Sequence, residues 1–185
     1  FLLNKETGIS SNQLVQNIKK SLRLKKVGHL GTLDPMATGL MVIAVNRATK
    51  FSSYFLESDK SYYATVKLGS STNTDDALGK IIETSDNLPT EENTQEVLNS
   101  FIGKSFQMAP FYSALKHKGK PLYKYAREGD FISKPPREIN IFSIKAFNFD
   151  HDECSFFIHC SKGTYIRSIA RDLGEKLGCG AHLSG

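Results

Sequence analysis

The sequence lacks the features of several large protein classes. Its longest apolar run, Leu40 to Val45, is far shorter than the roughly 20 residues that a membrane-spanning helix needs. Its three cysteines are an odd number without a CxxC pair, so neither a disulfide framework nor a cysteine-rich zinc site is expected. No charged, apolar and small-residue signal opens the chain. We therefore expect a cytoplasmic protein with no membrane segment.

Motifs for common kinds of catalysis are also missing. The chain contains no GxxxxGK[ST] loop and no GxGxxG turn that would bind a nucleotide phosphate. It contains no GxSxG turn of a serine hydrolase. The five histidines form no HxxxH or HExxH pair, and each fits a surface or core position better than a metal site. We expect neither a metal ion nor a cofactor.

The remaining composition is that of an ordinary globular protein. Among 185 residues, 39% are hydrophobic and 23% are charged, which is enough for a buried core without covalent staples. The 24 basic and 19 acidic residues leave a net charge of +5. This modest excess favours a polyanionic partner such as nucleic acid without establishing one.

Hydrophobic periodicity predicts helices and strands that do not alternate strictly. This pattern indicates one mixed α+β domain over residues 1–185 rather than a doubly wound sheet. The expected helices are 11–22, 91–102, Leu122–Arg127 and Tyr165–Leu177, and the expected strands are Leu40–Val45, Tyr62–Leu68, Ile139–Phe149 and Cys154–Cys160.

A glycine-rich segment, GHLGTLDPMATG, covers Gly28 to Gly39. Three glycines and a proline in twelve residues predict a shaped loop without regular structure. Pro35 restricts the backbone of Asp34 to extended conformations, so this carboxylate has a defined direction. By itself, an aspartate before a proline is more often a turn former than a catalytic group.

Several motifs resemble those of the TruB-type tRNA pseudouridine synthases. The motifs follow the order of that family and extend over nearly all of the chain. They are GHLGTLDPMATG, Ala48-Thr49-Lys50-Phe51, DKSYYATVKLG, Tyr112-Ser113-Ala114-Leu115-Lys116 and HCSKGTYIRSIARDLGEKLGCGAHL.

The resemblance implies a fold, a reaction and a substrate. The fold would be a mixed, largely antiparallel sheet with flanking helices and a central catalytic cleft. The reaction would isomerise uridine 55 in the T-arm loop of tRNA to pseudouridine, without metal or cofactor. Asp34 would be the essential carboxylate, acting either as a nucleophile or as a base that takes a sugar proton.

The same resemblance assigns substrate-binding roles. Tyr62 would stack on the flipped uracil, and His29 would take the vacated place in the RNA stack. Tyr165 and Arg167 match the KGTYIR motif, and this arginine would pair with the catalytic carboxylate. Helical spacing puts Ile166 toward the core, with Tyr165 and Arg167 beside the apolar stripe. Without the family match, each of these residues fits an ordinary structural role.

Two basic regions are candidates for RNA contacts. The first is the end of the first helix with Lys19 and Lys20, which fits a solvated helix end as well as a phosphate-binding patch. The second, about 105–137, matches the family's insertion that grips the RNA loop, and its cations, including Lys116 and Lys118, alternate with tyrosines. The expected partner is therefore the tRNA T-arm stem-loop, bound by a monomer.

Departures and alternatives remain. The chain reads Asn4-Lys5 where the family usually has Asp-Lys. It lacks the family's C-terminal RNA-binding domain, so we expect a fragment. The alternatives are a catalytically silent RNA-binding module, a family member acting in a guide-RNA particle, and a carboxylate hydrolase. The hydrolase would need a second acid near Asp34, and none is indicated.

Overall fold

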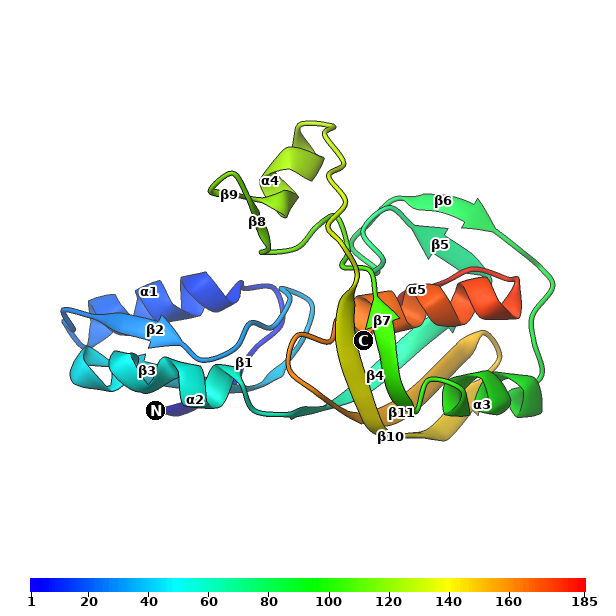
Figure 1. The fold of residues 1–185 in the computed structure, drawn as a ribbon, viewed down its shortest axis with the longest axis horizontal. Coiled ribbons are helices and arrows are strands. Elements are labelled where there is room, and N and C mark those ends of the chain that lie inside the picture. The colour runs from blue at the N-terminus through cyan, green and yellow to red at the C-terminus, as the bar shows by residue number, and fades with distance from the viewer. The chain divides into compact units, whose positions relative to one another are not determined.

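The computed structural model describes all residues from 1 to 185 and has an α+β fold (Figure 1). Its contacts divide it into two compact units, Phe1–Ser58 and Asp59–Gly185. Each unit builds its own sheet, and every pair of named strands is antiparallel. The predicted fold class, helices with a largely antiparallel sheet, is confirmed.

The first unit packs helix α1 on a three-stranded sheet of order β1-β3-β2. Ser10 caps α1, and its side chain and that of Gln13 form a reciprocal capping box. Val15 of the helix packs with Met41 and Ile43 of β3 in the core of this unit. The elements are β1 (Leu2–Lys5), α1 (Ser11–Ser21), β2 (Val27–His29), β3 (Gly39–Val45), the 3-10 helix η1 (Asn46–Phe51) and α2 (Ser52–Leu56).

The glycine-rich segment is more regular than its composition predicts. Gly28 and His29 lie in β2 and Gly39 begins β3, so the predicted loop was too long at both ends. Gly28 pairs with Ala44 of β3, and this pairing outweighs the weak strand preference of glycine. The loop itself covers residues 30–38. It connects two paired strands, so both of its ends are fixed.

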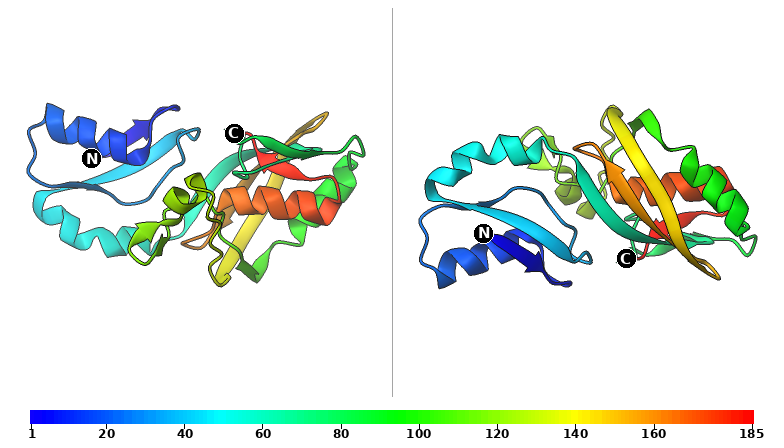
Figure 2. Two further views of the ribbon diagram at one scale, coloured as in Figure 1. Left: turned by 90° about the horizontal axis from the view of Figure 1, so that it is seen from above. Right: turned by 90° about the horizontal axis from the view of Figure 1, so that it is seen from below.

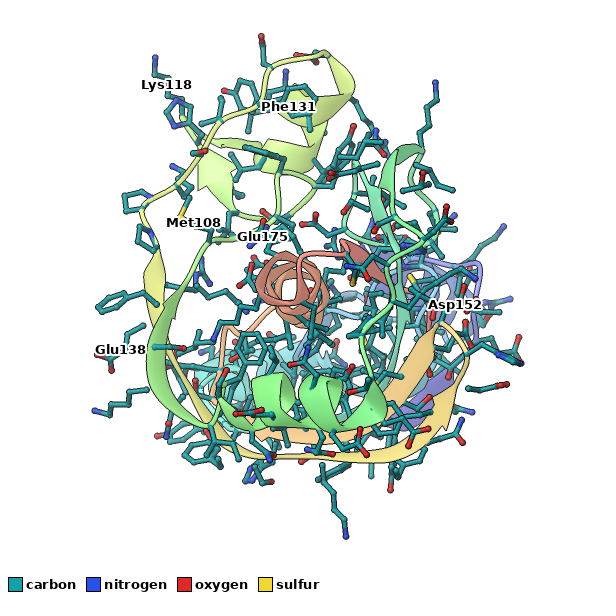
Figure 3. All side chains as sticks on the ribbon, turned by 90° about the vertical axis from the view of Figure 1, so that its right-hand side faces the viewer. Met108, Lys118, Phe131, Glu138, Asp152 and Glu175 are labelled. Atoms are coloured by element: carbon teal, nitrogen blue, oxygen red, sulfur yellow. The ribbon has the colours of Figure 1, made fainter.

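The second unit curves a five-stranded sheet of order β12-β4-β11-β10-β7 around α5 (Figures 1 and 3). Strands β10 and β11 form a long twisted hairpin (Figure 2). The elements are β4 (Lys60–Leu68), β5 (Ser70–Thr72), β6 (Ile81–Thr84), α3 (Glu91–Asn99), β7 (Gly103–Gln107), β8 (Lys116–His117), β9 (Lys120–Pro121), α4 (Leu122–Arg127), β10 (Arg137–Asp150), β11 (Glu153–Cys160), α5 (Ile166–Leu177) and β12 (Ala181–Leu183).

Helix α5 follows the predicted apolar stripe at most positions. Ile169, Ala170 and Leu173 are buried against the sheet, and the helix ends at Gly178, whose φ of 71° suits glycine. The prediction for the first turn was wrong. Ile166 is only half-buried, whereas Arg167 is 5% exposed. Arg167 is buried because carbonyl oxygens of other segments accept hydrogen bonds from its guanidinium. Helical spacing does not predict such long-range contacts.

The structure also shows the state of the cysteines and the character of the helices. Cys154, Cys160 and Cys179 are free, buried thiols, and burial raises the pKa of Cys154 to about 12. None of the helices has the length and the apolar character that crossing a membrane requires.

Candidate functional site

The loop that carries Asp34 is held by hydrogen bonds on both sides of this half-buried residue. The Ser11 hydroxyl accepts from the backbone N–H of Leu33 at 3.0 Å and donates to its carbonyl at 2.9 Å. On the other side, the N–H of Gly8 donates to the carbonyl of Pro35 at 2.8 Å. The backbone at Asp34 is therefore fixed between the start of α1 and the segment that follows β1.

Lys5, at the end of β1, is the central support of this loop. Its side chain is fully buried, and its ammonium donates to the carbonyls of Glu6, Pro35 and Ala37 at 2.9, 3.3 and 2.7 Å. Burial lowers the pKa of Lys5, and attraction to the Asp34 carboxylate opposes this shift. A buried ammonium with three carbonyl partners thus positions the loop and places positive charge beside Asp34.

Replacing Lys5 with methionine is expected to lower the free energy of unfolding by about 1–3 kcal/mol, because the Ala37 carbonyl loses its charged donor. Urea unfolding would be measured beside Lys25→Met, an exposed lysine in the same unit. Equal stabilities of the two variants would contradict this role for Lys5.

His29 lies in β2, four residues before Leu33, and is half-buried. Its Nδ1 atom lies 2.7 Å from the carbonyl oxygen of Gly31. A carbonyl only accepts, so Nδ1 carries the proton and a neutral ring leaves Nε2 as an acceptor. The bond fixes the direction of the ring within the first unit.

In the second unit, Tyr62 and Tyr165 lie on different elements. Tyr62 is half-buried in β4 on the same face as Ala64 and Val66, as the alternation predicts. Tyr165 caps α5, and Gln107 holds its backbone: the amide oxygen accepts from the Tyr165 N–H at 2.8 Å, and the amide nitrogen donates to its carbonyl at 3.1 Å. The guanidinium of Arg137 lies 5.4 Å from the centre of the Tyr165 ring.

Arg167 is fixed by partners within the second unit. Its guanidinium donates to the carbonyls of Thr74 and Tyr112 at 3.2 and 3.1 Å. The carboxylate of Asp76 lies 3.8 Å away, and both side chains of this ion pair are almost fully buried. Asp76 in turn accepts from the Thr74 hydroxyl and the Leu78 N–H at 2.6 and 3.0 Å. The expected pairing of Arg167 with Asp34 stays a prediction.

A second ion pair ties the same turn to α5. Arg171, one helical turn after Arg167, donates to Asp75 at 3.2 Å and to Asp172 at 2.7 Å. Asp75 is a non-glycine residue with a φ of 61°. Burial raises the pKa of Asp75 above its ordinary 3.8, although Arg171 and Arg167 oppose the shift.

This raised pKa gives a testable pH dependence. The folded chain binds the Asp75 proton more tightly than the unfolded chain, so this group stabilises the fold most at acid pH. That contribution is lost as the pH rises from about 4 through the folded pKa. The unfolding free energy of the wild type minus that of Asp75→Asn should therefore be larger at pH 4.5 than at pH 7. Urea titrations at both values check this, and a difference that grows toward pH 7 would refute it.

The segment between β7 and β10 has a small core of its own and projects from the sheet of the second unit (Figure 1). Leu122 and Ala126 are buried, and the ammonium of Lys120 pairs with Glu128 and lies over the ring of Tyr125. Helix α4 matches the predicted bounds. Figure 3 shows Lys118 at the outer end of this segment and Met108 at its base.

The remaining predicted cations are all exposed. Lys19 and Lys20 lie at the end of α1 in the first unit, and Lys116 and Lys118 lie at the β8–β9 hairpin in the second. Lys118 has a φ of 47°, so it lies in the turn of this hairpin with a left-handed backbone.

Sequence reasoning missed three supporting residues. Lys5, Asp76 and Gln107 were not predicted, although each holds a segment that carries a predicted site residue. Each acts over 30 residues or more along the chain: Lys5 on Ala37, Asp76 on Arg167, and Gln107 on Tyr165. The only local signal was the lysine of Asn4-Lys5, which follows the apolar pair Leu2-Leu3 in the same strand.

The chain is similar to known protein families, curated sequences and solved structures. A family model described as TruB family pseudouridylate synthase (N terminal domain) matches residues 19–166. The tRNA pseudouridine synthase B of Vibrio atlanticus is 49% identical over 184 residues, which cover 100% of this chain and 58% of the relative. That of Blochmanniella floridana is 51% identical over 183 residues, covering 99% of this chain and 72% of the relative.

Solved structures agree with these matches. A chain from the crystal structure of a Cbf5-Nop10-Gar1 complex is 28% identical, with a TM-score of 0.73 over 99% of this chain and 46% of its own length. An H/ACA RNP bound to a substrate RNA gives a TM-score of 0.71 at 26% identity, covering 99% of this chain and 44% of the neighbour. The chain spans 58% of the length of the Vibrio relative, 72% of that of the Blochmanniella relative and less than half of these structures.

Proposed function

Because this chain belongs to the TruB family of pseudouridylate synthases, we propose that it carries the catalytic groups of an enzyme that isomerises uridine to pseudouridine in tRNA. The observation that carries the proposal is the loop of Asp34. Lys5 and Ser11 hold its backbone on both sides of the aspartate. Such fixed placement is what a catalytic carboxylate requires and what a simple turn former does not need.

The reaction requires three changes in the uridine. The bond between C1′ and N1 breaks, the base turns over, and C1′ bonds to C5. In the product C5 has lost its proton and N1 has gained one. Atoms and electrons balance without an oxidant or reductant. We propose Asp34 as the group that acts on the sugar, either by attack or by accepting a proton. The Lys5 ammonium places a positive charge beside this carboxylate.

The target base has to leave the RNA stack before it can react, which costs a few kcal/mol. We propose that Tyr62 stacks on the flipped uracil and that His29 takes its place in the RNA. His29 suits this role because its Nδ1 bond to Gly31 fixes the ring and leaves Nε2 for an RNA donor. Tyr165 and Arg167 are proposed as further substrate-binding residues, each held by backbone contacts in the second unit.

The proposed substrate is uridine 55 in the T-arm loop of tRNA, bound by a monomer in the cytoplasm. The curated relatives near 50% identity are named tRNA pseudouridine synthase B, whereas the neighbours from guide-RNA particles are 26–28% identical. These identities favour the stand-alone enzyme over the guide-RNA alternative. We propose that the segment between β7 and β10, with Lys116 and Lys118, grips the RNA loop.

Mapping the modified position tests this proposal. An unmodified tRNA transcript would be incubated with the chain, treated with a carbodiimide that marks pseudouridine, and read by reverse transcription. We expect one stop, directly 3′ to position 55, which marks pseudouridine at that position. A transcript with cytidine at position 55 is the matched control and should give none. Modification only at other positions would refute the T-arm assignment.

A further inference from the structure

The charge of the chain is unevenly divided between its two units. Residues 1–58 carry eight Lys and Arg against three Asp and Glu, whereas residues 59–185 carry sixteen of each. The net charge of +5 therefore belongs entirely to the first unit. Within that unit, no acidic residue occurs between Glu6 and Asp34, a stretch that contains α1 and the turn after it.

The end of α1 forms a shallow open hollow whose lining is basic. Three of its five lining residues are cations, and none of these cations forms an ion pair. The lining residues are Gln16, Lys19, Lys20, Arg23 and Leu24. Gln16, Lys19 and Lys20 follow the spacing i, i+3 and i+4 and share one face of the helix, and Arg23 joins them from just beyond the helix end. Like charges gathered in one hollow repel, and a bound anion would offset the repulsion.

Backbone geometry places Arg23 in this hollow. The N–H of Leu24 donates to the carbonyl of Lys19 at 2.9 Å, and that of Arg23 donates to Lys20 at 3.2 Å. These two bonds are the Schellman arrangement, in which the residue after the helix has positive φ and is most often glycine. Here that residue is Arg23, with φ at 49°. A cation thus occupies a left-handed backbone position that disfavours any residue with a side chain. Neither solubility nor helix capping requires an arginine at this position.

The hollow lies at a set distance from the loop of Asp34. Ser11, at the start of α1, bonds the backbone of Leu33. Lys19 follows Ser11 by eight residues, which is about 12 Å along a helix. Helix α1 runs away from this loop within the first unit (Figure 1). An anion at Lys19 is therefore separated by about 12 Å of helix from Ser11, which holds the residue next to Asp34.

We propose that this hollow binds a backbone phosphate of the substrate RNA, several nucleotides from the uridine that reacts. The inference rests on the proposed function for its ligand. A phosphodiester fits because guanidinium and ammonium groups are its usual partners, and because an open hollow lets the strand continue on both sides. The contact would fix the position of the RNA along α1 relative to Asp34.

The test uses two triple variants that remove the same charge. Lys19→Gln/Lys20→Gln/Arg23→Gln empties the hollow, whereas Lys25→Gln/Lys26→Gln/Lys50→Gln changes exposed cations of the same unit outside it. Binding of a T-arm hairpin with cytidine at the target position is measured at several salt concentrations, so that turnover plays no part. We expect the hollow variant to reduce the magnitude of the slope of log K against log salt by about 0.7–1.8, which corresponds to the loss of one or two phosphate contacts. The control variant should change this slope by less than half as much.

Single neutral methylphosphonates in the hairpin then locate the contact. We expect one or two positions away from the target nucleotide to weaken binding by the wild type and the control, but not by the hollow variant. Equal slopes for the two triples, no coupled position, or no measurable hairpin binding would overturn the inference. The proposed function is judged separately, by turnover on the uridine hairpin. If the chain turns over this hairpin but no methylphosphonate position depends on the hollow, only the phosphate contact is refuted. If such a position is found but the hairpin is not turned over, only the proposed enzymatic function is refuted.

Discussion

Replacement of Asp34 by asparagine is expected to lower turnover by about 10²–10⁴-fold or more while RNA binding changes little. Asparagine keeps the size of the side chain and the bonds of Lys5 and Ser11 to the loop backbone, but its amide neither attacks nor accepts a proton as a carboxylate does. Turnover of a T-arm hairpin and its dissociation constant would be measured in parallel.

The matched control is Glu6→Gln, which removes the nearest acidic charge in the sequence before Asp34. This variant should keep near-wild-type turnover, which would separate loss of the catalytic group from a general change of charge. A tenth or more of wild-type turnover in Asp34→Asn would show that Asp34 is not the catalytic carboxylate.

Substitutions of Tyr62 are expected to separate stacking from proton transfer. Phenylalanine keeps the ring and loses the hydroxyl, so we expect normal RNA binding with most turnover lost, because some base has to remove the C5 proton and the sequence indicates no other candidate. Leucine also loses the stacking contact, which contributes about 1–3 kcal/mol, so RNA binding should weaken as well. Turnover and hairpin binding would be measured for both variants.

Tyr63 supplies the control for this pair. It is the next residue of β4, lies on the opposite face of the sheet and is 77% exposed. Tyr63→Phe and Tyr63→Leu should both keep near-wild-type turnover. If Tyr62→Phe and Tyr62→Leu also keep it in a folded protein, Tyr62 is a packing residue only.

Local patterns predicted the elements that local interactions determine. Helix α4 has the predicted bounds, and α5 begins one residue later than predicted, because capping residues and apolar spacing act within a few positions. The alternation of β4 also placed Tyr62 on the buried side. In contrast, strand β1 was not predicted, since four residues carry little periodicity and the residues it pairs with in β3 lie 34 to 40 positions along the chain.

Burial of charge was the main feature that the sequence did not reveal. Lys5 and Arg167 are both buried because carbonyl oxygens from distant segments accept their hydrogen bonds. On β3 the sequence instead overestimated burial. Leu40 was predicted in a buried strand but is 67% exposed, because side chains alternate along the strand and this one points outward. Motif matching located Asp34, but only the structure identified what holds it.

The most direct test of the account is tritium release from a T-arm hairpin that carries 5-tritiated uridine at the target position. Isomerisation frees the hydrogen at C5, whereas binding alone does not. The account predicts that the chain releases one tritium for each pseudouridine formed and that Asp34→Asn releases almost none. Stable binding of the hairpin by the wild-type chain without any tritium release would contradict it and would leave an RNA-binding module in place of an enzyme.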